Sequence, residues 1–269
     1  MNTDQSVPMD VKLMNRVTSA LLVVAVLLLL RLLAAQVQRL PQFDIRGITV
    51  VGDVSHYNAI TLRANVMPRL QGTFFTLDVN ATRQVFETMP WVRQAVVRRD
   101  FPNRLKVQLQ EHKAVAYWGP EGDTRLVNSF GEVFEANLGE VEQDNIPRLF
   151  GPDSQSAQVL TMYQKLQASF GPKDMALTQL ELMPRGSWRG MLDTGTELEL
   201  GNGNPDELVQ RTQRFLQTMT QATANFKRSP EQLTLVDLRH KDGYAILIDG
   251  VSTVTADAVT HGIKMQGNR

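Results

Sequence analysis

The feature that most constrains this chain is an apolar run close to its amino terminus. Over residues 17–37 the only side chains that are not apolar are Thr18, Ser19, Arg31 and Gln36. As an α-helix these twenty-one residues rise about 31 Å, which matches the ~30 Å hydrocarbon core of a bilayer. Arg31 lies toward one end of the run, where its long side chain reaches the interface. The run therefore predicts a single transmembrane helix over residues 17–37.

A cleaved signal peptide is the alternative interpretation of the same run, with residues 17–30 as its apolar core. A cleavage site at Leu33-Ala34-Ala35 is poor because leucine is too large for the −3 position, so an uncut anchor is favoured. Basic residues are nearly balanced across the span and do not fix its orientation. Because the foldable sequence follows the span, we expect a short cytoplasmic tail, residues 1–16, and soluble domains outside the cytoplasm.

Charge and cysteine content argue against several classes of function. The 269 residues carry 28 basic and 28 acidic side chains, so no net charge draws the chain to nucleic acid. The chain contains no cysteine, which excludes disulfides, thiolate catalysis and cysteine-ligated metals. We predict neither a cofactor nor a metal site.

Residues 42–112 have the pattern of a small module in the order β-α-α-β-β. The clearest strand alternates, with Leu105, Val107 and Leu109 facing inward between polar neighbours, as in an antiparallel strand with one wet face. Asn80 is the expected N-cap of the second helix. The predicted elements are strands over 45–51, 92–101 and 105–111 and helices over 60–67 and 80–89.

Residues 113–249 predict a second, β-rich domain in which a mixed sheet is backed by two helices. One helix is expected over 156–170, and a longer one begins with Asn204 as N-cap and Pro205 at its first position. The apolar stripe of the longer helix is expected to be Leu208, Phe215, Met219, Ala222 and Phe226. With residues 250–269 as a mobile tail, the fold class is α+β.

Several short motifs carry a resemblance to a known family. In the first module they are Gly72-Thr73-Phe74, Asp78-Val79-Asn80, Pro90-Trp91-Val92-Arg93, Val97-Arg98-Arg99, Phe101-Pro102-Asn103 and Leu105-Lys106-Val107. In the second they are Leu149-Phe150-Gly151-Pro152, Ser187-Trp188, Leu198 to Gly201 and Val236-Asp237-Leu238-Arg239. In order and spacing the first module resembles a POTRA domain. The whole chain resembles the FtsQ/DivIB family of bacterial cell-division proteins.

The resemblance implies a function and a location. It implies a non-enzymatic divisome scaffold in the inner membrane at the division septum, with a cytoplasmic amino terminus and two periplasmic domains. Its implied partners are FtsB and FtsL, a membrane-anchored coiled-coil pair. The expected contact is addition of a partner strand to the closing strand of the second domain.

The resemblance also points to the residues of this contact. They are Asn202, Arg239, His240, Lys241, Asp242, Gly243, Tyr244, Ala245, Ile246, Leu247 and Ile248. Three positions depart from the family pattern. Asn202 stands where a basic residue is common, His240 where a tyrosine is common, and Ile248 where a tryptophan is common, so the contact is expected to differ in shape.

The pattern of the closing strand itself leaves two possibilities open. Residues 245–248 are apolar on both faces, which fits a buried central strand. The strand also ends the fold, so it is equally compatible with a sheet edge whose unpaired backbone groups accept another strand.

The sequence contains no recognisable catalytic constellation. His56, His112, His240 and His261 are scattered and are expected to be surface residues, and no metalloprotease or serine-hydrolase motif is present. A cell-wall hydrolase would need such a cluster. The other alternative is a POTRA-containing component of polypeptide export or envelope assembly, for which a barrel of alternating segments would be expected.

Overall fold

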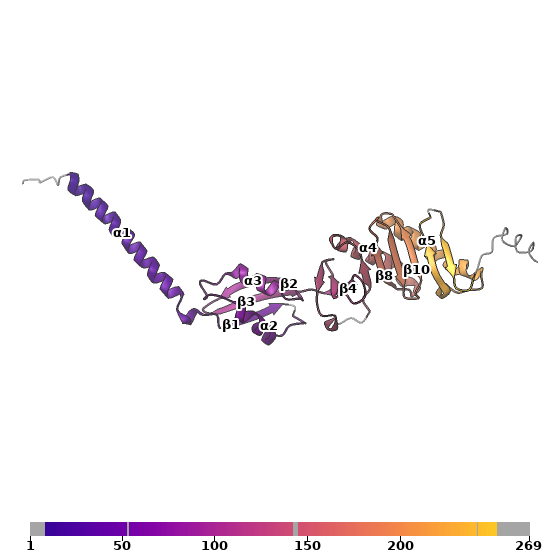
Figure 1. The fold of residues 1–269 in the computed structure, drawn as a ribbon, viewed down its shortest axis with the longest axis horizontal. Helices are drawn as coiled ribbons and strands as arrows, with labels where there is room; N and C mark the ends of the chain where they lie inside the picture. The colour runs from indigo at the N-terminus through magenta and orange to yellow at the C-terminus, as the bar shows by residue number, and fades with distance from the viewer. Residues whose placement is uncertain (1–8, 53, 142–144, 241, 252–269) are drawn as a thin grey trace, which may run out of the picture. The chain divides into compact units, whose positions relative to one another are not determined.

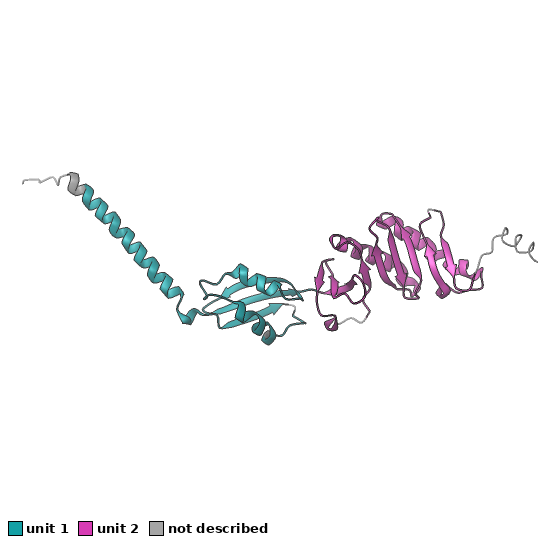
Figure 2. Cartoon of the chain, in the orientation of Figure 1, with its two compact units in different colours: residues 1–112 teal, residues 113–269 magenta. Residues whose placement is uncertain are grey.

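A computed structural model describes residues 9–52, 54–141, 145–240 and 242–251. They form two compact units, residues 1–112 and residues 113–269 (Figure 2). Most of the tail expected at 250–269 and half of the tail expected at 1–16 lie outside the described residues.

The apolar run forms a continuous helix, α1, over Met9–Gln38 (Figure 1). Among the described residues, Leu13–Gln38 is the one stretch long and apolar enough to cross a membrane. The helix starts eight residues before the predicted span, because the polar residues that precede the apolar run also adopt helical geometry. No glycine or proline interrupts this part of the chain.

The first unit contains a three-stranded sheet in the order β1-β3-β2. The central strand pairs in parallel with β1 and antiparallel with β2. The predicted alternation of β3 is confirmed, since Leu105, Val107 and Leu109 are buried. Helix α3 packs on β2, and α2 packs on β1. The bounds are β1 Gly47–Gly52, α2 Ala59–Val66, α3 Val79–Glu87, β2 Val92–Asp100 and β3 Arg104–Glu111.

One local prediction in this unit is wrong. The N-cap of α3 is Asp78, whose carboxylate accepts from the Asn80 and Ala81 amides, so Asn80 lies inside the helix. In α2 the buried residues are Leu62 and Val66, whereas Ile60 is 81% exposed. Asp and Asn are nearly equal as caps, so local preference alone does not choose between them.

The second unit is built on a nine-stranded sheet in the order β12-β11-β10-β9-β8-β7-β4-β5-β6. Pairs β4–β7, β7–β8 and β10–β11 are parallel and the other pairs are antiparallel. The bounds are β4 Ala114–Trp118, β5 Arg125–Asn128, β6 Val133–Glu135, β7 Arg148–Phe150, β8 Leu177–Leu182, β9 Trp188–Leu192, β10 Glu197–Gly201, β11 Leu233–Asp237 and β12 Ala245–Ile248. The α+β class is confirmed.

Helices α4, Ser156–Phe170, and α5, Pro205–Ala224, pack on the sheet and against each other (Figure 1). Both were predicted with these starts, and Asn204 forms a complete capping box with Glu207. Phe226, predicted in the buried stripe, lies beyond the end of α5 and is exposed. Short 3-10 helices occupy Pro41–Phe43, Met67–Arg69, Leu138–Glu140, Asp153–Gln155, Gly171–Lys173 and Pro230–Gln232.

Candidate partner-binding surface

The closing strand β12 lies at one end of the nine-stranded sheet. It pairs antiparallel with β11, where Asp237 stands opposite Ala245 and Val236 opposite Ile246. In the described part of the chain no strand pairs with the outer side of β12. Of the two possibilities left open by the sequence, the structure therefore selects the sheet edge.

The backbone of β12 presents alternate residues to its neighbour and to the outside. The Asp249 amide donates to the Gln232 carbonyl, and the Leu247 carbonyl accepts from Thr234. The backbone amides and carbonyls of the odd-numbered residues therefore point toward β11. By the alternation of an antiparallel pair, the amide and carbonyl of Ile246 point away from β11. An added strand would hydrogen-bond there.

The side chains of β12 divide between the core and the surface. Ile248 is buried, and Ile246 is half-buried against the core of the unit. Leu247 is 53% exposed and Ala245 is also exposed. The exposed face therefore offers an apolar contact beside the free backbone edge.

Tyr244 connects the start of β12 to helix α5. Its hydroxyl shares a hydrogen bond of 2.7 Å with the Thr218 hydroxyl. Its ring meets the buried Phe215 ring edge to face, with centroids 5.3 Å apart. These contacts hold the edge strand against the helix layer.

Arg239 is held by Asp237 at the end of β11. Its amide, Nε and Nη2 donate to the Asp237 carboxylate at 3.0, 2.9 and 2.6 Å. These hydrogen bonds to the Arg239 side chain lower the pKa of Asp237 to about 2. The Arg239 side chain is still 60% exposed, so it presents a fixed positive charge to solvent.

Asn202 and Arg239, far apart in sequence, are brought together by the parallel pairing of β10 and β11. Gly201 has a φ of 75°, and a Cβ there would stand 2.8 Å from Arg239 Cγ, so the arginine stem covers this glycine. Arg211 of α5 donates to the Asn202 carbonyl at 3.0 Å.

Arg211 is a basic group that sequence reasoning missed at this place. Helical side chains point back toward the helix amino terminus, so a residue two turns into α5 reaches the loop before it. That direction was the available signal. A cation thus lies beside position 202 although the residue itself is neutral.

The remaining predicted residues lie on the loop between β11 and β12. His240, Asp242 and Gly243 are exposed. Lys241 lies outside the described residues. The structure therefore places the predicted residues that it describes on one continuous stretch of edge and loop, joined by Asn202 from the neighbouring loop.

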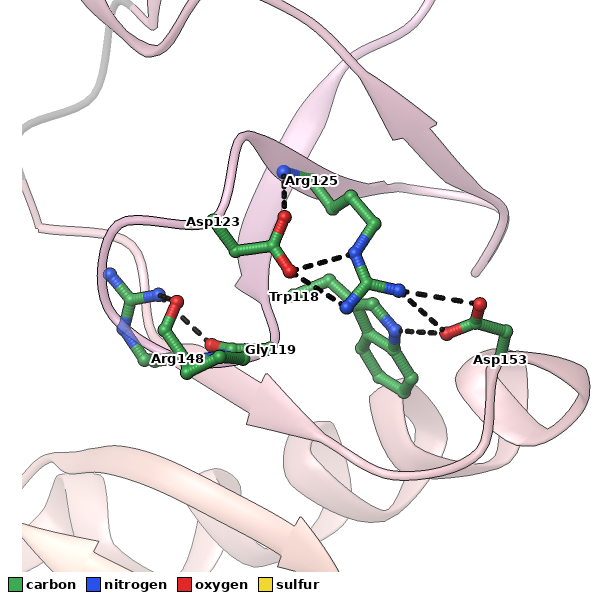
Figure 3. Close-up of polar contacts among 7 residues, drawn as sticks. Trp118, Gly119, Asp123, Arg125, Arg148 and Asp153 are labelled. Carbon is green, nitrogen blue, oxygen red and sulfur yellow. Dashed lines mark hydrogen bonds and ion pairs between the residues drawn. The ribbon is translucent and has the colours of Figure 1, made fainter.

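A second polar cluster lies at the opposite part of the sheet and was not predicted (Figure 3). The buried Trp118 indole donates to Asp153 at 2.7 Å. Arg125 contacts Asp153 at 3.1 Å and reaches Asp123 through Nε and Nη2 at 2.9 and 2.7 Å. The hydrogen bonds between Asp123 and Arg125 lower the pKa of the carboxyl and raise that of the guanidinium.

Arg148 completes this cluster from strand β7. It donates to the carbonyls of Gly119 and Pro120 at 3.0 Å each, and its guanidinium lies 5.0 Å from the centre of the Tyr117 ring. Arg125 is paired with the two carboxylates, and Arg148 is held by backbone carbonyls. The arrangement therefore stabilises the turn between β4 and β5.

His56 corrects one expectation, because it is a packed residue with an exposed side-chain fraction of 14%. Its ring stacks on Trp91 with centroids 3.7 Å apart, and its Nδ1 lies 2.8 Å from the buried Glu111 carboxylate. Glu111 also accepts from the Ser55 and His56 amides. Within the described ranges, no group of three potential ligands could hold a metal ion.

Comparison with known proteins gives two matches to family profiles. Residues 43–112 match "POTRA domain, FtsQ-type", and residues 116–239 match "Cell division protein FtsQ/DivIB, C-terminal". The second match ends just before the loop that leads to β12.

Individual relatives match over most of the chain. The cell division protein FtsQ of Burkholderia pseudomallei is 38% identical over 251 residues, which covers 91% of this chain and 96% of the relative. That of Thiomonas arsenitoxydans is 36% identical over 250 residues, covering 92% and 90%. That of Bordetella pertussis is 32% identical over 256 residues, covering 89% and 92%.

Proposed function

The chain belongs to the FtsQ/DivIB family of cell-division proteins, and from this premise we propose that it is a non-enzymatic scaffold of the divisome. It recruits and links the membrane-anchored division proteins FtsB and FtsL at the septum. It catalyses no reaction of its own. The contact forms when an extended segment of FtsB adds as a further strand to β12.

The observation that carries this proposal is the free outer side of β12. The Ile246 amide and carbonyl point outward, Leu247 is exposed beside them, and the strand contains no charged residue or proline that would block pairing. Strand addition obtains affinity from backbone hydrogen bonds and specificity from alternate side chains. The fixed charge of Arg239 supplies a further point of selection at the end of the strand.

Helix α1 gives this contact its membrane setting. We propose that it crosses the inner membrane once, with the amino terminus in the cytoplasm and both compact units in the periplasm. Anchoring both partners in one membrane raises their effective concentration. A contact of modest intrinsic affinity is then sufficient for assembly.

The test is calorimetric titration of the full chain in detergent with the extracytoplasmic segment of FtsB from the same organism. Ile246→Pro removes the Ile246 amide, which points away from β11. An edge strand tolerates proline at a position whose amide faces solvent. Ile246→Ala is the matched control, because it shortens the same side chain and keeps the amide. Circular dichroism checks that both variants are folded.

The expected result is binding by the wild type and by Ile246→Ala, and no measurable binding by a folded Ile246→Pro variant. Equal binding by the two variants would exclude β12 as the strand acceptor. Absence of wild-type binding would remove the FtsB contact from the proposal.

Orientation is tested with a single introduced cysteine, because the chain has none of its own. Gln94 is exposed on β2 of the first unit. Gln94→Cys is expected to react with a membrane-impermeant maleimide from the periplasmic side of intact spheroplasts. Labelling only after the cytoplasm is opened would reverse the proposed topology.

A further inference from the structure

Four phenylalanines gather at one end of the first unit and are here called the phenylalanine cluster. Phe43 meets Phe75 with ring centroids 4.9 Å apart, and Phe74 meets Phe75 and Phe101 at 5.2 and 5.7 Å. The rings are not buried in the core of the unit. Phe101 is 70% exposed and Phe75 43% exposed. A connected apolar surface of this kind marks an interaction site.

The topology of the sheet brings these rings together. Strands β1 and β3 are parallel, and Gly47 at the start of β1 lies opposite Arg104 at the start of β3. The turn that carries Phe101 is fixed there, because the Arg46 amide donates to the Asn103 carbonyl at 2.9 Å. The cluster therefore lies at the end of the sheet where β1 begins.

The same end of the unit is covalently attached to α1. Phe43 lies only five positions after Gln38, the last residue of α1. Even a fully extended chain of that length spans only about 17 Å. The Thr73 hydroxyl also donates to the Gln38 carbonyl at 2.6 Å, and the Phe74 amide donates to the Phe43 carbonyl at 2.7 Å.

This attachment restricts the depth of the cluster. If α1 crosses a bilayer, its end lies near the boundary between acyl chains and headgroups. The headgroup region adds several ångströms on each side of the hydrocarbon core. Phe43, where the phenylalanine cluster begins, then lies within about 17 Å of that boundary, whatever direction α1 takes.

The charges around the cluster are compatible with lipid headgroups. Arg39, Arg46 and Arg104 are exposed at this end of the unit, alongside the exposed Asp44 and Asp100. Cations outnumber carboxylates there. Aromatic rings beside basic side chains are the combination typical of membrane–water interfaces.

We propose that the phenylalanine cluster lies in the lipid interface of the bilayer that α1 crosses and holds the first unit against the membrane surface. The proposal rests on the membrane span proposed above. Its occupant is lipid and not another protein. A second contact with the bilayer would limit rotation of the first unit about its attachment to α1.

Tryptophan reporters can test this in the full chain reconstituted in nanodiscs. Phe101→Trp places a fluorophore in the cluster, and Gln94→Trp places one on the strand that leads to it, seven residues or about 23 Å away. Leu27→Trp reports on the middle of α1. Lipids with a nitroxide near the headgroup or deep in the acyl chain quench emission, and the signal of the native tryptophans in the wild type is subtracted.

We expect the shallow nitroxide to quench Phe101→Trp roughly twofold or more above Gln94→Trp, because interfacial aromatic rings lie at headgroup depth. The deep nitroxide should quench Leu27→Trp. Equal quenching at positions 101 and 94, with Leu27→Trp still quenched, would overturn the inference and leave the span intact. Loss of quenching at position 27 would instead refute the span.

A second variant separates lipid contact from mere proximity. Phe75→Asp, made in the Phe101→Trp protein, places a charge inside the cluster and is expected to reduce quenching at position 101 to the level of position 94. Phe75→Leu is the matched control and should retain the quenching. Unchanged quenching in a folded Phe75→Asp variant would show that the cluster is not seated in lipid.

Discussion

The two edge strands of the nine-stranded sheet, β6 and β12, differ in how well they are protected from pairing with another strand. At one end β6 has only three residues, Glu135 on it is exposed, and the neighbouring strands are joined by the cluster of Trp118, Arg125 and Asp153. At the other end β12 carries no charge and exposes Leu247 beside unpaired backbone groups. Short, charged edges resist pairing, whereas longer apolar edges invite it.

The polar groups at the β6 end have partners within the domain, whereas the outward backbone groups at the β12 end do not pair with another described strand. The polar groups around Arg125 satisfy one another, so that end of the sheet is completed by the chain itself. The outward groups of Ile246 find no strand partner among the described residues, and this is the end at which we propose that a second chain adds. Four predictions test this contrast.

Breaking the cluster of Trp118, Arg125 and Asp153 should have the largest effect on stability. Trp118→Ala removes a fully buried ring and the indole donor to Asp153, and should cost about 3–5 kcal/mol of unfolding free energy in the second unit. Urea unfolding followed by circular dichroism measures this. Phe130→Ala, at an exposed apolar residue near the same end, should stay within about 0.5 kcal/mol of wild type. A small effect at Trp118 would contradict its assigned structural role.

Altering the β12 end of the sheet should change binding and leave stability intact. Leu247→Lys puts a charge on the exposed face of β12 and should weaken FtsB binding by about 1–3 kcal/mol, measured by calorimetry. Phe130→Lys, an exposed apolar residue near the β6 end, should bind like wild type. Equal losses for the two variants would show that the two edges are not distinguished by the partner.

The pair of Asp237 and Arg239, at the end of β11, predicts that the stability of the second unit depends on pH. Because the folded pKa of Asp237 is lowered from 3.8 to about 2, its stabilisation is present above pH ~4 and is lost as the pH falls toward 2. Since Arg239 is exposed, we expect about 1 kcal/mol and not the full value of the shift. Asp237→Asn should remove this part of the pH profile in urea unfolding. Parallel profiles for variant and wild type would contradict the assignment.

The smallest effect is expected at the anchor of β12. Tyr244→Phe removes only the hydrogen bond to Thr218, which is accessible to solvent, and should cost ~0.5 kcal/mol of stability. Hydrogen exchange of the β12 amides should rise more than exchange elsewhere in the second unit. Uniform exchange across the sheet would mean that the hydroxyl does not position the strand.

Much of the fold is predictable from local patterns. The alternation of β3 and the cap at Asn204 each report on neighbours within a few residues. The predictions fail where the structure depends on more than these local patterns. Phe226 continues the helical spacing, but the chain leaves the helix before it, and Lys227 adopts a left-handed conformation. Strand β7 is only three residues long, too short for a period to be recognised.

The candidate site is less accessible to such reasoning. The apolar pattern of residues 245–248 fits both an edge and a central strand, because strand order depends on pairings between distant segments. The cluster in Figure 3 joins Trp118 to Asp153 across 35 positions, and no local spacing signals it. The resemblance supplied the choice of β12, and the structure supplied the direction of its backbone groups.

The contact between Gly201 and Arg239 has an evolutionary consequence. A side chain at position 201 would be strained by the backbone and would collide with the arginine stem, so Gly201 is constrained both by its own φ and by its neighbour. Position 201 should therefore remain glycine among relatives, even where position 239 changes. A designer who transplants the loop of Asn202 into another scaffold would have to carry the end of β11 with it.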